Sequence, residues 1–128
     1  MTGLSPEIIK MDPANGSIFA SPRDRHNLLR PETAESLYFM WMLTRRKEYR
    51  RVAWRMFLSF RQHSRLPDGA YVSLQDVFYN ASHEDPILRK YGRFRDGINA
   101  EMPSYWIGET LKYLYLIFQP PKRLPLDE

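Results

Sequence analysis

Three charged side chains surround one proline in residues 28–37. Arg30 precedes Pro31, and Glu32 and Glu35 follow it with a spacing of three. Proline suits the first position of a helix, where its missing N–H leaves no hydrogen bond unmade, and residues three apart lie on one helix face. We therefore expect both carboxylates to address one site at the start of a helix. A plainer interpretation is that they only complement the helix dipole.

Apolar residues recur at helical spacing on both sides of a short polar break. They predict one helix over residues 32–43 and a second, antiparallel helix over residues 49–63, separated by a turn at residues 44–47. A third helix is expected over residues 105–118. Its apolar residues run almost all the way round, which is typical of a helix buried between others.

The rest of the chain predicts connections between these helices. Residues 3–27 contain three prolines and two glycines without sustained periodicity, which predicts a connector with a short extended pair. A Pro-Asp-Gly turn at residues 67–69 precedes an extended stretch at residues 71–74. Residues 80–103 are polar and carry no convincing period, so they predict a long loop.

Two blocks of sequence resemble one known family. Residues 25–37 read RHNLLRPETAESL and residues 108–118 read GETLKYLYLIF. Both resemble glycoside hydrolase family 47, the class I α-1,2-mannosidases, and shorter similarities at residues 3–7, 49–57 and 69–77 extend the resemblance over nearly the whole chain. It implies an all-α fold in which residues 1–128 are a C-terminal fragment of a catalytic domain. That fragment would be a partial (α/α)7 barrel of about three main helices joined by long loops.

The resemblance also implies roles for five side chains. Glu32 matches the general base of an inverting hydrolysis, in which a second carboxylic acid protonates the leaving oxygen. Arg30 matches a sugar-binding arginine, and Tyr105 stands where an aromatic residue packs on the sugar. Glu109 matches a substrate-binding carboxylate, and Glu35 and Glu109 match carboxylates that reach a Ca²⁺ ion through water. We expect Arg30, Glu32 and Glu109 to converge on one pocket between two helices whose starts are level.

Other observations leave alternatives open. Glu109 has a plainer interpretation as a surface partner of Lys112. Residues 102–104 read Met-Pro-Ser where the family has Met-Glu-Ser. The resemblance also implies that the family's general acid belongs upstream of Met1. The calcium-binding threonine of the family lies in a terminal stretch that this sequence lacks. We therefore expect the isolated chain to be inactive. It would then serve as a non-catalytic glycan-recognition or quality-control module, or as a helical piece that binds a protein partner.

Composition limits the partners. The chain has 19 Lys and Arg residues against 15 Asp and Glu residues, a net charge of +4, and acidic residues interrupt its basic stretches, so solvated helix faces are favoured over a nucleic-acid surface. There is no cysteine, which excludes disulfides and Cys-bound metals. No apolar run approaches the roughly 20 residues that span a bilayer, so no membrane contact is expected from this segment.

The resemblance implies the partner and the compartment. The partner would be a high-mannose N-glycan or a glycoprotein, in the lumen of the endoplasmic reticulum or Golgi. Two N-glycosylation patterns, at residues 15–17 and 80–82, are compatible with a luminal location but are common by chance. The three helices also carry more aromatic surface than they can bury among themselves, for which the missing barrel helices are the natural cover.

Overall fold

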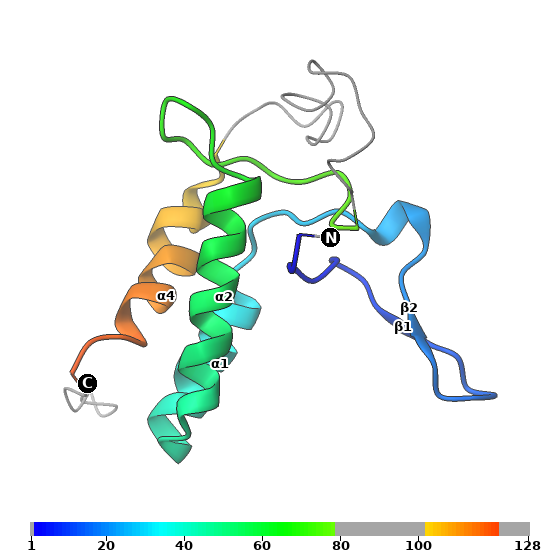
Figure 1. The fold of residues 1–128 in the computed structure, drawn as a ribbon, viewed down its shortest axis with the longest axis horizontal. Coiled ribbons are helices and arrows are strands. Elements are labelled where there is room, and N and C mark those ends of the chain that lie inside the picture. The colour runs from blue at the N-terminus through cyan, green and yellow to red at the C-terminus, as the bar shows by residue number, and fades with distance from the viewer. Residues whose placement is uncertain (1, 79–101, 121–128) are drawn as a thin grey trace. The chain divides into compact units, whose positions relative to one another are not determined.

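The computed structural model describes residues 2–78 and 102–120 (Figure 1). These residues are mostly helical, and their elements in chain order are β1 (Lys10–Met11), β2 (Ile18–Phe19), the short 3₁₀ turn η1 (Pro22–Asp24), α1 (Glu32–Thr44), α2 (Lys47–His63), the π-helical segment η3 (Trp106–Leu111) and α4 (Lys112–Leu116). They fall into two compact units. Residues 1–29 and 56–103 form the hairpin unit, and residues 30–55 and 104–128 form the three-helix unit, so that α2 contributes to both.

The first two helices follow the sequence pattern closely. α1 begins at Glu32, directly after Pro31, and α2 begins at Lys47, which confirms the predicted break. At Arg45 the backbone takes a left-handed conformation with φ of 57°, and its N–H donates to the Trp41 carbonyl at 2.9 Å. This hydrogen bond satisfies one of the carbonyls that a helix end leaves free, and it turns the chain into α2.

The third predicted helix is present, but its first half is not a regular α-helix. Residues 104 and 105 are helical, η3 continues as a π-helix, and α4 then completes the segment. A π-helix closes its hydrogen bonds over five residues instead of four. Such segments are rare in proteins, and those that occur often lie at functional sites. The sequence pattern did not predict this wider turn.

Within the three-helix unit, α1 packs against η3 and α4. The Tyr113 ring lies 5.8 Å from the Tyr38 ring and 6.3 Å from the Phe39 ring, measured between centroids. Figure 1 shows α1 and α4 running in the same direction. The side chains that this unit buries come from all three of its helical segments: Ala34, Tyr38, Ala53, Trp106, Thr110, Leu114 and Ile117.

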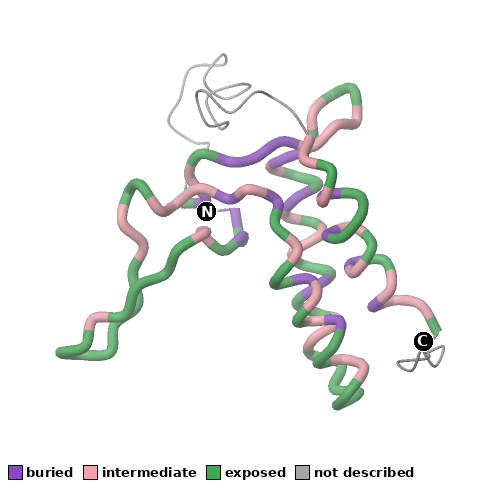
Figure 2. Tube along the Cα trace, turned by 180° about the vertical axis from the view of Figure 1, so that it is seen from behind, coloured by how far each residue is buried: buried purple, intermediate pink, exposed green. Residues whose placement is uncertain are grey.

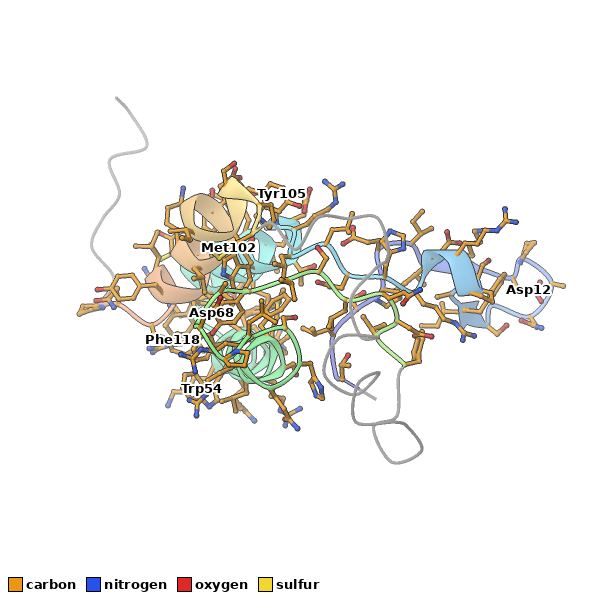
Figure 3. All side chains as sticks on the ribbon, turned by 90° about the horizontal axis from the view of Figure 1, so that it is seen from above. Asp12, Trp54, Asp68, Met102, Tyr105 and Phe118 are labelled. Carbon is orange, nitrogen blue, oxygen red and sulfur yellow. The ribbon has the colours of Figure 1, made fainter. Side chains whose placement is uncertain are left out.

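One arginine of α2 ties the other two helices together. The Arg50 guanidinium carbon lies 5.0 Å from the centroid of the Trp41 ring and 5.2 Å from that of the Phe118 ring. Its Nη2 also donates to the Phe118 carbonyl at 3.1 Å. Trp54 meets Phe118 edge to face at 5.8 Å, and Figure 3 shows these two side chains close together.

The hairpin unit is built from short extended segments around the end of α2. β1 and β2 pair antiparallel, with Lys10 opposite Phe19 and Met11 opposite Ile18. The predicted extended stretch at residues 71–74 makes isolated antiparallel bridges at each end, to Arg65 and to Asn27. The buried apolar residues of this unit are Leu4, Leu29, Phe60, Val72, Leu74 and Val77.

Leu29 combines full burial with an unusual backbone. Its φ is 63°, a left-handed conformation that non-glycine residues rarely adopt. Its side chain is 0% exposed, and its N–H donates to Asn27 Oδ1 at 3.1 Å. This strained residue directly precedes Arg30, the first residue of the predicted site.

These observations correct one expectation and leave another outside the described residues. The expected all-α fold holds in part: the described residues are mostly helical, but a small antiparallel strand pair, β1 and β2, accompanies the helices and confirms the short extended pair predicted within residues 3–27. The predicted loop over residues 80–103 lies almost entirely outside the described residues. Among those described, no helix has both the length and the apolar character needed to cross a membrane.

Candidate functional site

The predicted site residues all belong to the three-helix unit, and one hydrogen bond marks where their helices meet. The Tyr113 hydroxyl of α4 donates to Glu35 Oε1 in the first turn of α1, at 2.9 Å. The bond raises the pKa of Tyr113 above its ordinary value of 10.0, and burial and the negative charges of Glu35 and Glu109 act in the same direction. Two predicted carboxylates therefore lie close to one phenol.

Arg30 and Glu32 stand at the start of α1 with exposed side chains. Glu32 is the first residue of the helix, and Glu35 lies one turn further on and is half-buried. Exposure suits the expected roles, because a general base must touch the water that it activates and a guanidinium fork must be open to its ligand. Both carboxylates lie in the first turn of one helix, as predicted, because α1 begins at Glu32.

Tyr105 and Glu109 lie on the other helix. Tyr105 is half-buried immediately before η3, and Glu109 is exposed within η3, four residues before Tyr113. Among the described residues, Glu109 makes no ion pair with Lys112, so the structure offers no support there for its plainer interpretation as a surface partner. The Lys112 Nζ instead lies 4.7 Å from the centroid of the Tyr113 ring.

The two helices run side by side, but their starts are not level. Glu35 in the first turn of α1 meets Tyr113, which lies seven residues after the start of η3 at Trp106. Since Glu35 lies only three residues after the start of α1, η3 begins before α1. The convergence of Arg30 and Glu32 with Glu109 on one pocket stays a prediction.

Glu35 and Glu109 are the two carboxylates for which a role toward a metal ion was expected. In residues 2–78 and 102–120, no group of three or more His, Asp or Glu side chains is arranged to hold a metal. Calcium takes about six to eight oxygen ligands, whereas Glu35 and Glu109 supply two carboxylates. Two carboxylates are fewer oxygen ligands than a calcium ion takes, and their expected role toward calcium through bound water stays a prediction.

Two features of this unit were missed by the sequence reasoning. Tyr113 was not recognised as the partner of Glu35, although its spacing of four from Glu109 places both on one helix face. The second is an open groove of about 350 Å³ lined by Arg50, Arg51, Trp54, Arg55 and Phe118. Its arginines were interpreted as a solvated helix face, and none of the predicted site residues lines it.

The two helices that meet at the hydrogen bond between Tyr113 and Glu35 carry the segments, residues 25–37 and 108–118, that resemble glycoside hydrolases, so this is the class of protein to compare. Residues 1–128 match the sequence profile of glycosyl hydrolase family 47, and the chain belongs to this family. The resemblance seen in residues 25–37 and 108–118 is thereby confirmed.

The relatives and one solved structure agree with this assignment. The chain is 42% identical to the endoplasmic reticulum mannosyl-oligosaccharide 1,2-alpha-mannosidase of Mus musculus, over 91% of this chain and 16% of that protein. The enzyme of the same name from Homo sapiens is 40% identical, over 98% of this chain and 17% of that protein. The enzyme from Schizosaccharomyces pombe is 39% identical, over 92% of this chain and 21% of that protein. An alpha-1,2-mannosidase from Trichoderma reesei is similar in structure, with a TM-score of 0.63 and 27% identity over 85% of this chain and 19% of its own. The chain thus spans about one fifth or less of each relative.

Proposed function

We propose that residues 1–128 form a C-terminal part of the catalytic domain of an α-1,2-mannosidase that removes mannose from high-mannose N-linked glycans. Relatives of at least 39% identity that carry this activity in their names support the substrate class. The structural observation that carries the proposal is the hydrogen bond from Tyr113 to Glu35, because it joins the two helices that bear the matching residues. The same relatives support a place in the secretory pathway, in the endoplasmic reticulum or Golgi lumen.

The residues divide the chemistry between them. Glu32 takes a proton from the water that attacks the anomeric carbon, and a part of the catalytic domain other than residues 1–128 supplies the general acid that protonates the leaving oxygen. Arg30 offers a fixed fork of donors to the sugar hydroxyls, and Tyr105 presents its ring to a sugar face. Attack from the side opposite the leaving group inverts the configuration at that carbon.

Tyr113 holds Glu35 in place. The hydroxyl donates to one oxygen of the Glu35 carboxylate, which fixes the orientation of the other oxygen. Glu35 and Glu109 would hold waters around a calcium ion, which when bound would supply positive charge for the mannose hydroxyls. Calcium dependence is part of the proposal.

A chimeric enzyme tests the roles of these residues. Residues 1–128 replace the matching stretch of the Schizosaccharomyces pombe relative, and mannose release is measured on a high-mannose oligosaccharide. We expect turnover that requires calcium and gives β-mannose as the first product by NMR. Glu32→Gln should lower kcat about 10²–10⁴-fold. Glu48→Gln is the matched control. Glu48, on α2, pairs with Arg46 at 2.8 Å and has no proposed role in the reaction.

Residues 1–128 alone form the second arm of the test. We expect them to release no mannose, because a base without its acid leaves the leaving oxygen unprotonated. Turnover by the isolated chain that Glu32→Gln abolishes would contradict the expected inactivity. An active chimera that tolerates Glu32→Gln would remove Glu32 from the mechanism. Mannobiose binding by the isolated chain without hydrolysis would instead favour a glycan-recognition module.

A further inference from the structure

The hairpin unit displays an Asn-Gly-Ser pattern at its tip. Asn15, Gly16 and Ser17 lie in the turn between β1 and β2, and residues 13–17 are all exposed. Figure 2 shows this tip as an exposed stretch, and Figure 3 labels Asp12 at the outer end of the hairpin. A Cβ built on Gly16 would meet no atom within 4 Å. The pattern therefore stands in open space within its unit.

The turn that carries the pattern is held by its own hydrogen bonds. The N–H groups of Asp12 and Gly16 donate to the carbonyls of Ser17 and Asp12, both at 2.8 Å. The Ala14 N–H donates to Asp12 Oδ1 at 2.9 Å, and Gly16 has a φ of 71°, which glycine adopts without strain. Because all these contacts lie within residues 12–17, the turn can form before the rest of the chain has folded.

The side chain of Asn15 is held by the turn through its oxygen and is open to solvent at its nitrogen. Its Oδ1 accepts a hydrogen bond from the Ser17 N–H at 2.8 Å, so the turn fixes the direction of the amide. Among the described residues, Asn15 Nδ2 and Ser17 Oγ make no hydrogen bond, and both residues are exposed. The amide nitrogen and the hydroxyl two residues later are therefore open together to an approaching enzyme.

We propose that Asn15 is an acceptor for an N-linked oligosaccharide. The donor is an oligosaccharide on a lipid diphosphate, the chemical class that a membrane-bound transferase of the secretory pathway uses. A bond forms between Asn15 Nδ2 and C1 of the first sugar while the bond from C1 to the phosphate oxygen breaks. The amide proton passes to a base, and the lipid diphosphate leaves. In cells the modification rests on the luminal location that belongs to the proposed function.

The folded hairpin can carry such a group without rearrangement. Its turn bonds use backbone groups and the Asp12 and Asn15 side-chain oxygens, so a glycan on Nδ2 breaks none of them. At the base of the hairpin, Lys10 Nζ pairs with Asp24 Oδ2 at 3.0 Å, and this ion pair holds the hairpin to η1. A bulky hydrophilic group at the tip would also shield the neighbouring apolar side chains of Met11 and Ile18, which are 67% and 72% exposed.

Translation with microsomes tests the acceptor independently of where the protein resides in cells. The chain is fused to a cleavable signal sequence, and import is verified by signal cleavage and protease protection. We expect a glycan that an amidase removes, leaving aspartate at position 15 in the peptide mass spectrum. Asn15→Gln and Ser17→Ala should abolish it. Ser17→Ala is the sharper variant, since it keeps the backbone N–H that binds Asn15 Oδ1, and Ser17→Thr should retain the glycan.

The second pattern, at residues 80–82, serves as the internal control. Asn80→Gln should leave the glycan at position 15 unchanged. An imported and protected chain with unmodified Asn15 would overturn the proposal, as would a glycan at that residue that survives Ser17→Ala. If Asn15 carries a glycan after translation with microsomes but not in the protein isolated from its source cells, only the proposed luminal location is contradicted. The ability of Asn15 to accept a glycan would then still be established.

Discussion

At the scale of single residues, a neutral phenol supports a carboxylate in the first turn of α1. The Tyr113 hydroxyl donates to Glu35, and the charge of Glu109 lies near enough to oppose ionisation of the same hydroxyl. A tyrosine between two negative charges stays protonated to high pH, so it remains a donor over the whole physiological range. Tyr113 is therefore a positioning residue for Glu35.

Titration of Tyr113 follows from this arrangement. Its pKa in the folded chain is raised above 10.0. The hydrogen bond therefore stabilises the fold fully below that pH, and the stabilisation is lost as the pH rises through the raised pKa. We expect Glu35→Gln to move the pKa of Tyr113 back toward its ordinary value. NMR of labelled tyrosine rings measures this shift, with Tyr113→Phe to assign the signal.

The control for this titration is Glu48→Gln, which removes a carboxylate paired with Arg46. It should leave the pKa of Tyr113 unchanged. Tyr113→Phe should lower the free energy of unfolding at neutral pH by about 0.5–1 kcal/mol, a small loss because the pair is partly open to water. If Glu35→Gln does not change the pH at which Tyr113 ionises, then Glu35 is not its partner in solution.

At the scale of elements, the two neighbouring arginines of α2 make very different contacts. Arg50 lies against the rings of Trp41 and Phe118 and donates to the Phe118 carbonyl, whereas Arg51 is exposed. The planar guanidinium can stack on one face and still donate from its edge, which an ammonium cannot do. Arg50 thereby holds α1 and α4 to α2, and Arg51 faces the groove.

Lysine substitutions separate the two arginines while keeping the charge. Arg50→Lys should lower the free energy of unfolding by about 1–2 kcal/mol, because it loses the stacking on two rings and the carbonyl contact. Arg51→Lys should stay within about 0.5 kcal/mol of the parent. Urea unfolding of both variants measures the difference, and equal losses would show that the contacts of Arg50 do not hold the helices together.

Helix bounds could be predicted from the sequence, whereas helix type and register could not. The spacing of apolar residues and the left-handed break at Arg45 are local properties, so α1 and α2 appear within a few residues of their predicted ends. The π-helical form of η3 and the stagger between η3 and α1 depend on how buried side chains such as Trp106 fit against a neighbouring helix. The pattern of apolar residues within one segment does not say how its side chains fit against a neighbouring helix.

The same division holds for the candidate site. The charges and their spacing identified Arg30, Glu32 and Glu35 as one group, and the family resemblance added Tyr105 and Glu109. Tyr113 was missed because its role arises only from the contact between two segments 78 residues apart. The groove at Arg50 was missed for a similar reason, since Phe118, in the turn after α4, is distant from α2 in the sequence.

At the scale of the whole molecule, the three-helix unit leaves large apolar side chains uncovered. Leu43 is 80% exposed, Tyr115 65% and Ile107 59%, on α1, α4 and η3. Exposed apolar side chains mark an interaction face where they gather into one patch. The proposed place of this chain in a larger helical barrel supplies partners for that surface.

Self-association of residues 1–128 follows from this exposure. The chain alone should bind an apolar dye and form concentration-dependent oligomers in sedimentation experiments. Leu43→Glu and Ile107→Lys together should reduce both effects without lowering the free energy of unfolding by more than about 0.5 kcal/mol, since neither side chain is buried. A monomer that binds no dye at high concentration would count against an uncovered interface.

The left-handed backbone at Leu29 has a consequence for how this chain can diverge over generations. Glycine or asparagine would relax its φ of 63° but would leave an unfilled space where a fully buried leucine now sits. Valine or isoleucine would fill part of that space but tolerate the backbone worse. Glycine and asparagine thus improve the backbone at the expense of the packing, whereas valine and isoleucine improve neither. Substitution of Leu29 by any of these four residues is therefore disfavoured, and the link into Arg30 keeps its shape.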